Sequence, residues 1–243
     1  MLRVGIAIPG RANVVGTSDP LSIFGAASVL QWVRADLGIT LGTGVSAWAD
    51  QSGNGKHYTQ ATGANQPVYN ATDATLNYLP TVEATANGQN LLSSLALPNP
   101  TVLPWSVLIV AKFNTAPGLQ VLISSPTDAR PFVYSTATGS QLNASGNGGD
   151  IANVTSVAAW SRLRVDFSNS PSDVNRVGSV VVTGNIVNGV GTAPTQRQIF
   201  TISGNFCRAK IFEIVYLNKV ISAAEMSAYD AYVTAVTGGG VAV

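Results

Sequence analysis

The sequence predicts an all-β domain that begins with an extended apolar arm and ends in a single helix. Short β-prone segments recur between clusters of Gly, Asn, Pro and Ser, which is the pattern of strands joined by turns. One segment near the end carries a helix-capping signature, and the first 28 residues follow no regular period. A chain of 243 residues with this pattern fits one large all-β domain.

Two segments give the clearest strand signals. In residues 162–168, Leu163, Val165 and Phe167 alternate with charged and polar residues, which predicts a strand with one face buried and one in solvent. Residues 105–113 form a more continuous apolar run, which predicts a strand covered on both faces.

Further strands are predicted in the second half of the chain. Residues 177–183 and 186–187 read as a hairpin whose turn is Gly184-Asn185. Residues 199–202 and 210–217 supply two more strands. By contrast, residues 135–150 hold four glycines and are predicted to be a surface loop.

A helix is predicted at the end of the domain. Ser222 and Glu225 have the spacing of a capping box, and Gly238 provides a stop. The apolar positions that recur at helical spacing are Met226, Tyr229, Tyr232 or Val233, and Val236. We expect this face to pack over an open edge or end of the sheets.

The first 28 residues form an irregular apolar arm rich in Gly and Pro. Such a segment cannot bury itself, so we expect it to lie on its own domain or on a neighbouring subunit. The predicted organisation is an arm at 1–28, a domain at 29–237 and a tail at 238–243. The arm residues predicted to dock are Leu2, Val4, Ile6, Ile8, Val14 and Val15.

The composition excludes several classes of partner and site. Thirteen basic and twelve acidic residues give a net charge of +1, too little to attract a nucleic-acid backbone. The single cysteine, Cys207, allows no internal disulfide and no thiolate zinc cluster. The apolar runs are too short for a signal peptide or a membrane span, so we expect synthesis in a cytoplasm and no membrane insertion.

Two neighbouring segments carry a family resemblance. Residues 30–36 read Leu-Gln-Trp-Val-Arg-Ala-Asp, and residues 45–55 read Val-Ser-Ala-Trp-Ala-Asp-Gln-Ser-Gly-Asn-Gly. Together with 209–216 and 221–225, they resemble the concanavalin A-like (LamG-like) jelly rolls, which are frequent in bacteriophage structural proteins and bacterial surface proteins. The resemblance spans residues 29–237 and implies a two-sheet antiparallel jelly-roll sandwich. It indicates the fold but not the function, because lectins, glycosidases and structural modules share this fold.

The central motif has a structural and a metal-binding interpretation. Trp32 and Trp48 suit the space between two sheets, and Asp50 can accept backbone N–H bonds in a tight loop pinned over the core. An EF-hand is excluded, because its twelfth position would be Ala61 rather than an acid. A looser calcium site at Asp50 and Asn54, such as many LamG-like domains carry, stays an alternative; no other cofactor is expected.

Catalysis is not predicted. The glucanases of this fold place their carboxylates close together on one strand, whereas the two nearest acids here are Glu225 and Asp230. Glu213, in the last predicted strand, is interpreted as structural. His57 and Cys207 are the only histidine and cysteine, and no nucleophile elbow is present, so we expect a non-enzymatic protein.

Two functions follow from these observations. The first is a bacteriophage virion structural protein, such as a capsid decoration or a head or tail fibre-associated module. Its arm would bind capsid or tail proteins and sister subunits, and it would reside in the virion after synthesis in the host cytoplasm. The alternative is a carbohydrate-binding adhesin for cell-surface glycans, with Tyr58, Tyr69 and Tyr134 as candidate aromatic platforms beside Asn-rich loops.

Overall fold

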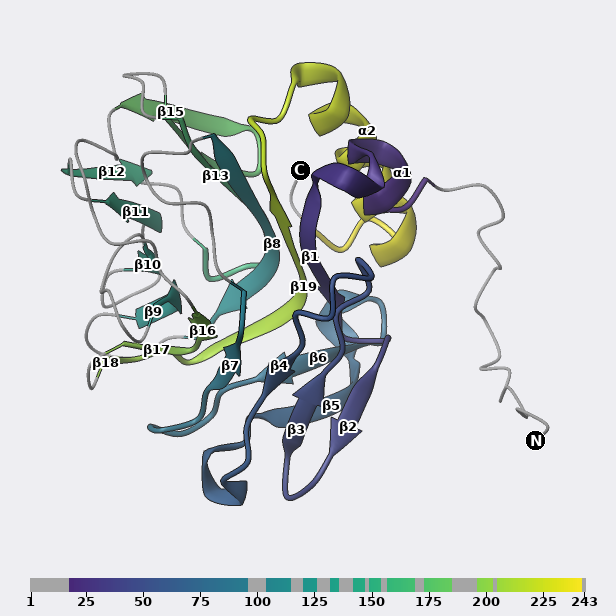
Figure 1. The fold of residues 1–243 in the computed structure, drawn as a ribbon, viewed down its shortest axis with the longest axis vertical. Coiled ribbons are helices and arrows are strands. Elements are labelled where there is room, and N and C mark those ends of the chain that lie inside the picture. The colour runs from purple at the N-terminus through teal and green to yellow at the C-terminus, as the bar shows by residue number, and fades with distance from the viewer. Residues whose placement is uncertain are drawn as a thin grey trace.

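Two antiparallel sheets packed face to face form the domain, with helices on one side (Figure 1). The computed structural model describes residues 18–95, 104–114, 120–125, 132–135, 142–146, 149–153, 157–168, 173–184, 196–202 and 205–241. Its two sheets and C-terminal helix confirm the predicted jelly-roll sandwich. In the described residues no helix has the length and apolar character needed to cross a membrane.

The sheet beneath the helices, sheet A, has eight strands in its described part, in the order β15-β14-β13-β8-β19-β6-β5, with β1 also paired to β19. The long central strands β8 and β19 come from the two most apolar runs of the chain. The strands of sheet A are β1 (Val29–Arg34), β5 (Val68–Asp73), β6 (Leu79–Glu83), β8 (Trp105–Phe113), β13 (Ser161–Phe167), β14 (Asp173–Val177), β15 (Val180–Gly184) and β19 (Ala209–Leu217).

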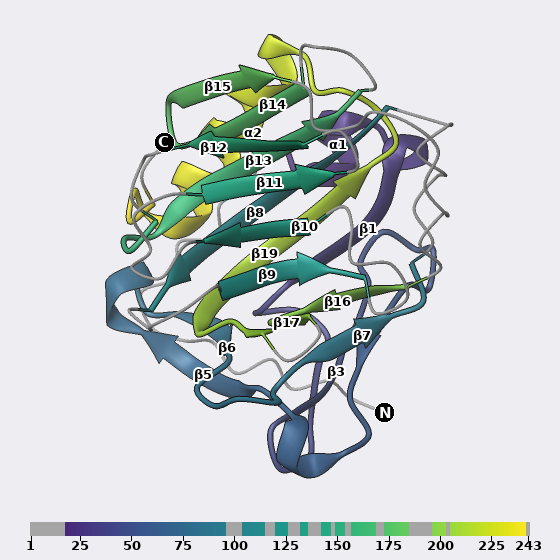
Figure 2. The same ribbon diagram turned by 90° about the vertical axis from the view of Figure 1, so that its left-hand side faces the viewer.

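The opposite sheet, sheet B, has nine strands in its described part, in the order β12-β11-β10-β9-β16-β7-β4-β3-β2 (Figure 2). A two-stranded ribbon, β17 (Thr201–Ile202) with β18 (Asn205–Phe206), adjoins it. The strands of sheet B are β2 (Ile39–Leu41), β3 (Val45–Trp48), β4 (Tyr58–Thr59), β7 (Leu91–Ser93), β9 (Gln120–Ser124), β10 (Phe132–Ser135), β11 (Leu142–Gly146), β12 (Gly149–Asn153) and β16 (Arg197–Ile199).

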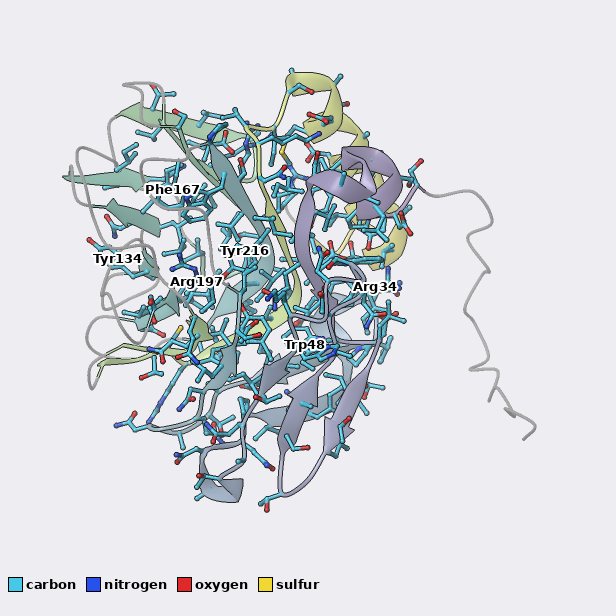
Figure 3. The ribbon with its side chains drawn as sticks, viewed as in Figure 1. Arg34, Trp48, Tyr134, Phe167, Arg197 and Tyr216 are labelled. Atoms are coloured by element: carbon cyan, nitrogen blue, oxygen red, sulfur yellow. The ribbon has the colours of Figure 1, made fainter. Side chains whose placement is uncertain are left out.

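The core between the sheets includes one row of large side chains from sheet B. Strand register places Trp48, Tyr58, Ser93 and Arg197 side by side on β3, β4, β7 and β16, facing sheet A. Figure 3 shows Arg197 and Tyr216 between the two sheets. The four side chains of this row and that of Tyr216 are each at most 1% exposed, so the row is part of the packed interior.

The outer face of sheet A is covered by two helices, α1 (Pro20–Phe24) and α2 (Ala223–Thr237). The ring centroids of Phe24 and Tyr229 lie 5.7 Å apart, so α1 packs directly on α2. The capping box at Ser222 and the left-handed Gly238 at the end of α2 are both present, as the sequence predicts. Residues 20–28 of the predicted arm are therefore helical and packed rather than extended.

The burial of strand β13 differs from its prediction, because helix α2 covers the face that was expected to be in solvent. Instead of one solvent face, all seven of its residues are buried. Arg162 pairs with Asp230 of α2 at 2.8 Å, and Arg164 pairs with Asp166 and donates to the carbonyl of Ile221 at 2.6 Å. The alternation is as predicted, but the polar face lies under α2 and not in water, so each charge needs a partner.

Three further expectations are corrected. The predicted strand at 177–183 is interrupted by a hairpin turn at Gly178-Ser179, where Gly178 has the positive φ of 56° that this tight turn requires, while Asn185 of the predicted turn and the strand at 186–187 lie outside the described residues. The predicted loop at 135–150 contains β11 and the start of β12. Trp48 lies between the sheets as expected, whereas Trp32 lies on the helix side, where its indole Nε1 donates to Glu213.

Candidate functional site

The outer face of sheet B carries a shallow hollow over β4, β7 and β16. Because Tyr58, Ser93 and Arg197 face inward, the strand alternation turns Thr59, Leu92 and their neighbours outward. The hollow has a volume of about 260 Å³. The residues that line it are Gly55, His57, Thr59, Leu92, Ser93, Ser94 and Gln196.

The lining of this hollow is polar but carries no fixed charge. Among the described residues that line it there is no Lys, Arg, Asp or Glu. Hydroxyl groups, an amide and an imidazole surround the single apolar side chain of Leu92. Such a set donates and accepts hydrogen bonds to a neutral polar molecule.

His57 is held in one orientation by the loop that precedes it. The backbone N–H of Asp50 donates to Nδ1 of His57 at 3.0 Å. In the neutral ring, a Nδ1 that accepts leaves the hydrogen on Nε2. His57 therefore presents a hydrogen-bond donor as its other polar atom.

Ser93 is held from behind by the core. Its hydroxyl donates to the carbonyl of Lys56 at 3.0 Å and accepts from Nε2 of Gln31 at 2.9 Å. Gln31 is fully buried on β1, so the contact ties the wall of the hollow to sheet A. The hydroxyl of Ser93 is therefore engaged in the core, and His57 is the polar side chain of the hollow that a contact outside it pre-positions, which reduces the entropy lost on binding.

The loop after β3 covers the open edge of β1. The carboxylate of Asp50 accepts from the N–H groups of Trp32, Ser52 and Lys56 at 2.9–3.0 Å, and from the hydroxyl of Ser52 at 2.8 Å. The side-chain amide of Asn54 donates to the carbonyls of Val29 and Leu30 at 2.9 and 3.1 Å. The structural interpretation of this motif is confirmed.

The same contacts bear on the calcium alternative. Both oxygens of Asp50 already accept hydrogen bonds, and Asn54 points its amide nitrogen at backbone carbonyls. Within the described ranges, no group of three or more His, Cys, Asp or Glu side chains could hold a metal ion. The loop geometry is a poor fit to calcium, and calcium binding stays an untested prediction.

Two of the three candidate tyrosines do not reach the hollow. Tyr58 is fully buried, its hydroxyl lies 3.4 Å from that of Tyr216, and burial raises its pKa well above the ordinary value. Its assignment as a platform is therefore wrong, because its ring faces the core. Tyr69 lies on β5 of sheet A, half-buried against the core, and so belongs to the other sheet.

Tyr134 is the candidate that shares the face of the hollow. Its neighbour Val133 faces the core, so Tyr134 points outward from β10, as Figure 3 shows. Strand β10 is separated from β16 by β9 alone, which corresponds to about 10 Å at roughly 4.8 Å per strand. A ligand longer than one ring could contact both the hollow and Tyr134.

The predicted docking residues of the arm, Leu2 to Val15, lie outside the described residues. Their role stays a prediction. The first described part of the arm contacts α2 and β1, so it lies on the helix side of sheet A, away from the hollow.

Two carboxylates of the described residues converge on one lysine, although the sequence proposed no pair. Asp73 and Glu83, on β5 and β6, lie 2.7 and 3.8 Å from the ammonium group of Lys210. Burial opposes ionisation of Asp73, but hydrogen bonds from Lys210 and Thr75 lower its pKa below the ordinary value. An acid held ionised by a lysine is unsuited to donate the proton that a glycosidase needs.

Two further groups with possible reactivity, Cys207 and Glu213, are buried. Cys207 is 1% exposed, and burial raises its pKa well above the ordinary value, so it is an unreactive thiol. Burial also raises the pKa of Glu213, although Tyr229 and Tyr232 of α2 both donate to it at 2.6 Å. Glu213 therefore fastens α2 to sheet A, in agreement with its structural interpretation.

Most residues of the hollow carry no local signal in the sequence. Thr59, Ser94 and Gln196 come from three distant segments, and only the pairing of β4 with β7 and of β7 with β16 brings them together. The available signal was the alternation around Tyr58, which places His57 and Thr59 on the face opposite a buried aromatic ring.

No family model and no curated protein matches this chain. Solved structures do match it in fold. The ligand-binding domain of botulinum neurotoxin serotype D, solved with N-acetylneuraminic acid, has a TM-score of 0.61 at 10% identity and covers 85% of this chain and 51% of its own. The serotype G binding domain has a TM-score of 0.61 at 8% identity and covers 84% and 50%. A binding domain of type DC, solved with rat synaptotagmin II, has a TM-score of 0.58 at 7% identity and covers 86% and 52%.

These likenesses are informative about the fold alone, because the identities are so low. The chain also spans only about half the length of the structures it matches. The ligands named for those domains were therefore found with proteins about twice as long as the part that matches this chain.

Proposed function

We propose that this chain is a non-enzymatic, lectin-like module whose outer sheet B face binds neutral glycans. The observation that carries the proposal is the uncharged polar hollow, in which the imidazole of His57 is fixed by the backbone N–H of Asp50. Glycan hydroxyls need donors and acceptors held in place, together with an aromatic or apolar surface. Leu92 supplies the apolar surface within the hollow, and Tyr134 supplies an aromatic ring on the same face.

The charge of the hollow favours neutral over acidic glycans. Recognition of a carboxylate or sulfate group uses Arg or Lys as a rule. None lines the hollow among the described residues. The nearest arginine along the strand, Arg197, faces the core instead. Sialylated and sulfated glycans are therefore expected to bind no better than their neutral counterparts.

The structural neighbours add support of a general kind. One of them was solved with N-acetylneuraminic acid, and the cell entry of botulinum neurotoxin type C depends on two ganglioside molecules. A sandwich of this shape therefore occurs in proteins that recognise glycans. Asp73 and Glu83, which do converge, are both engaged by Lys210, and this arrangement favours binding over hydrolysis.

A glycan array probed with the full chain, with and without calcium, tests the proposal. We expect selective binding of neutral glycans, with millimolar or tighter dissociation constants, that is the same in both conditions. The variant Thr59→Val with Gln196→Ala should weaken binding at least about tenfold, a loss of about 1.4 kcal/mol. Thr72→Val, at an exposed threonine on β5, is the matched control and should bind normally. A flat array, or equal losses in both variants, would reject the proposed site.

The second candidate function is attachment to a bacteriophage particle. It is favoured by the sequence resemblance to phage jelly rolls and by the apolar arm, and it is compatible with glycan binding by the exposed sheet. Because residues 20–28 pack against the domain, the truncation that tests it ends at residue 17. A chain without residues 1–17 is expected to fold but to fail to join particles; normal incorporation would refute the anchoring role.

A further inference from the structure

The edges of the two sheets differ in how they are protected from pairing with another chain. An open edge presents unpaired N–H and C=O groups, and proteins usually block it with bulges, charges, prolines or a covering loop. In the described part of the molecule, the open edges belong to β1, β2, β5, β12 and β15.

Four of these edges carry a recognisable block. The loop at Asp50 and Asn54 covers β1. Strand β2 has three residues and a register shift, and β5 has a register shift between Asn70 and Asp73. Strand β12 lies against β15, where the side-chain amide of Asn153 donates to the carbonyl of Val180 at 3.0 Å.

Among the residues that the structure describes, none provides such a block on the outer edge of β15. It reads Val-Val-Val-Thr-Gly, without charge or proline, and it pairs with β14 without a register shift. Val180 and Val181 are 44% and 52% exposed, which makes them two of the most exposed large apolar side chains among the described residues. A flat, apolar and uncharged edge of this kind is a template for a further strand.

The hairpin geometry shows which backbone groups are available. In a two-residue turn the flanking residues Val177 and Val180 form a hydrogen-bonded pair, and such pairs then recur at every second residue. Val180 and Val182 thus direct their N–H and C=O groups toward β14. Val181 and Thr183 direct theirs toward the open edge.

We propose that β15 pairs with β15 of a second copy of this chain, antiparallel, about a two-fold axis at Val182. In this register Val181 of one copy lies opposite Thr183 of the other, and the two pairs form four N–H···O bonds. The side chains that meet are β-branched, a favourable cross-strand combination. The two sheets A become one continuous sheet.

Charge does not oppose this pairing. The strand itself is neutral, and the nearest charged side chain in the register, Arg176 opposite Val181 on β14, is paired with Asp230 at 3.2 Å. Two copies thus meet without an unbalanced charge at the seam. The inference is independent of the glycan proposal, because β15 belongs to sheet A and the hollow to sheet B.

Sedimentation of the full chain and of charge-swapped variants tests the proposal. The full chain is expected to be a dimer. Val181→Lys with Thr183→Lys, and Val181→Glu with Thr183→Glu, should each weaken the dimer at least about tenfold, because like charges then face each other. Mixing the two variants should restore a dimer of one copy of each. Both positions are exposed, so the variants should fold.

A disulfide reports the register directly. Val182→Cys should form a disulfide-linked dimer on mild oxidation, because position 182 meets itself across the axis, while the buried Cys207 stays unreactive. Deletion of residues 1–17 should leave the dimer intact. The proposal is overturned by a full chain that stays monomeric at about 100 µM, by dimers that ignore both charge variants, or by dimers lost with the arm.

Discussion

Removal of the Asp50 carboxylate is the sharpest test of how the family motif stabilises this fold. Asp50 is 8% exposed and accepts four hydrogen bonds, from the N–H groups of Trp32, Ser52 and Lys56 and from the hydroxyl of Ser52. In Asp50→Ala, the donors of Ser52 and Lys56 lie in a loop that water can reach. The N–H of Trp32 is buried and is left without an acceptor.

The cost follows from these two kinds of donor. Hydrogen bonds to a charged acceptor contribute about 1.5–3 kcal/mol each, but they are not additive within one cluster, and a buried orphan donor costs about 1–3 kcal/mol. We therefore expect Asp50→Ala to lower the free energy of unfolding by about 3 kcal/mol. That is a large share of the roughly 5–15 kcal/mol that holds a domain folded.

Urea unfolding monitored by tryptophan fluorescence measures this difference, provided that the denaturant slope is unchanged. Ser52→Ala, which removes the hydroxyl that donates to Asp50 and accepts from the exposed N–H of Asn54, is the control and should cost about 0.5–1.5 kcal/mol. A loss below about 1 kcal/mol in Asp50→Ala would refute the pinned-loop reasoning. A chelator that destabilises the natural chain but not Asp50→Ala would instead place calcium in this loop.

Three further predictions concern groups outside the loop. Tyr78 combines a φ of 58° with 70% exposure, so Tyr78→Gly should raise the unfolding free energy by about 0.5–1 kcal/mol in urea titrations; a decrease would mean that the ring makes a stabilising contact. Burial raises the pKa of Glu213 above its ordinary value of 4.5, so the folded state holds its proton to higher pH than the unfolded state does. The stability of the natural chain relative to Glu213→Gln should then fall as pH rises above about 4.5, and a flat difference would contradict this. Asp230→Asn leaves the fully buried Arg162 without its anionic partner and should cost about 3 kcal/mol in thermal or urea unfolding, whereas a cost near zero would show that the ion pair is dispensable.

Elements with strong local signals could be predicted from the sequence. Strand β8 is a nine-residue apolar run and is buried throughout except at Lys112. Helix α2 begins at its capping box and ends at Gly238, because both signals act within one or two turns of the backbone. Neither prediction required knowledge of the remainder of the chain.

Features that depend on long-range packing were predicted incorrectly. The alternation in β13 is real, yet the polar face of the strand is buried, because α2 folds back over it from more than fifty residues away. Trp32 lies under the same helix for the same reason. The predicted strand at 177–183 was wrong because Gly178-Ser179 forms a turn within it, which only the strand register reveals.

The candidate site was the least predictable part, and the motif explains why. The best-defined residue of the motif, Asp50, caps the edge of β1 with its side chain and orients His57 with its backbone N–H. The residues that carry the family resemblance thus serve the fold and act on the hollow only indirectly. The residues that would contact a ligand, such as Thr59, Ser94 and Gln196, lie on an outward face that packing does not constrain. A chain can therefore retain the recognisable motif while its ligand specificity changes, which is why a resemblance of this kind predicts the sandwich and leaves its ligand to experiment.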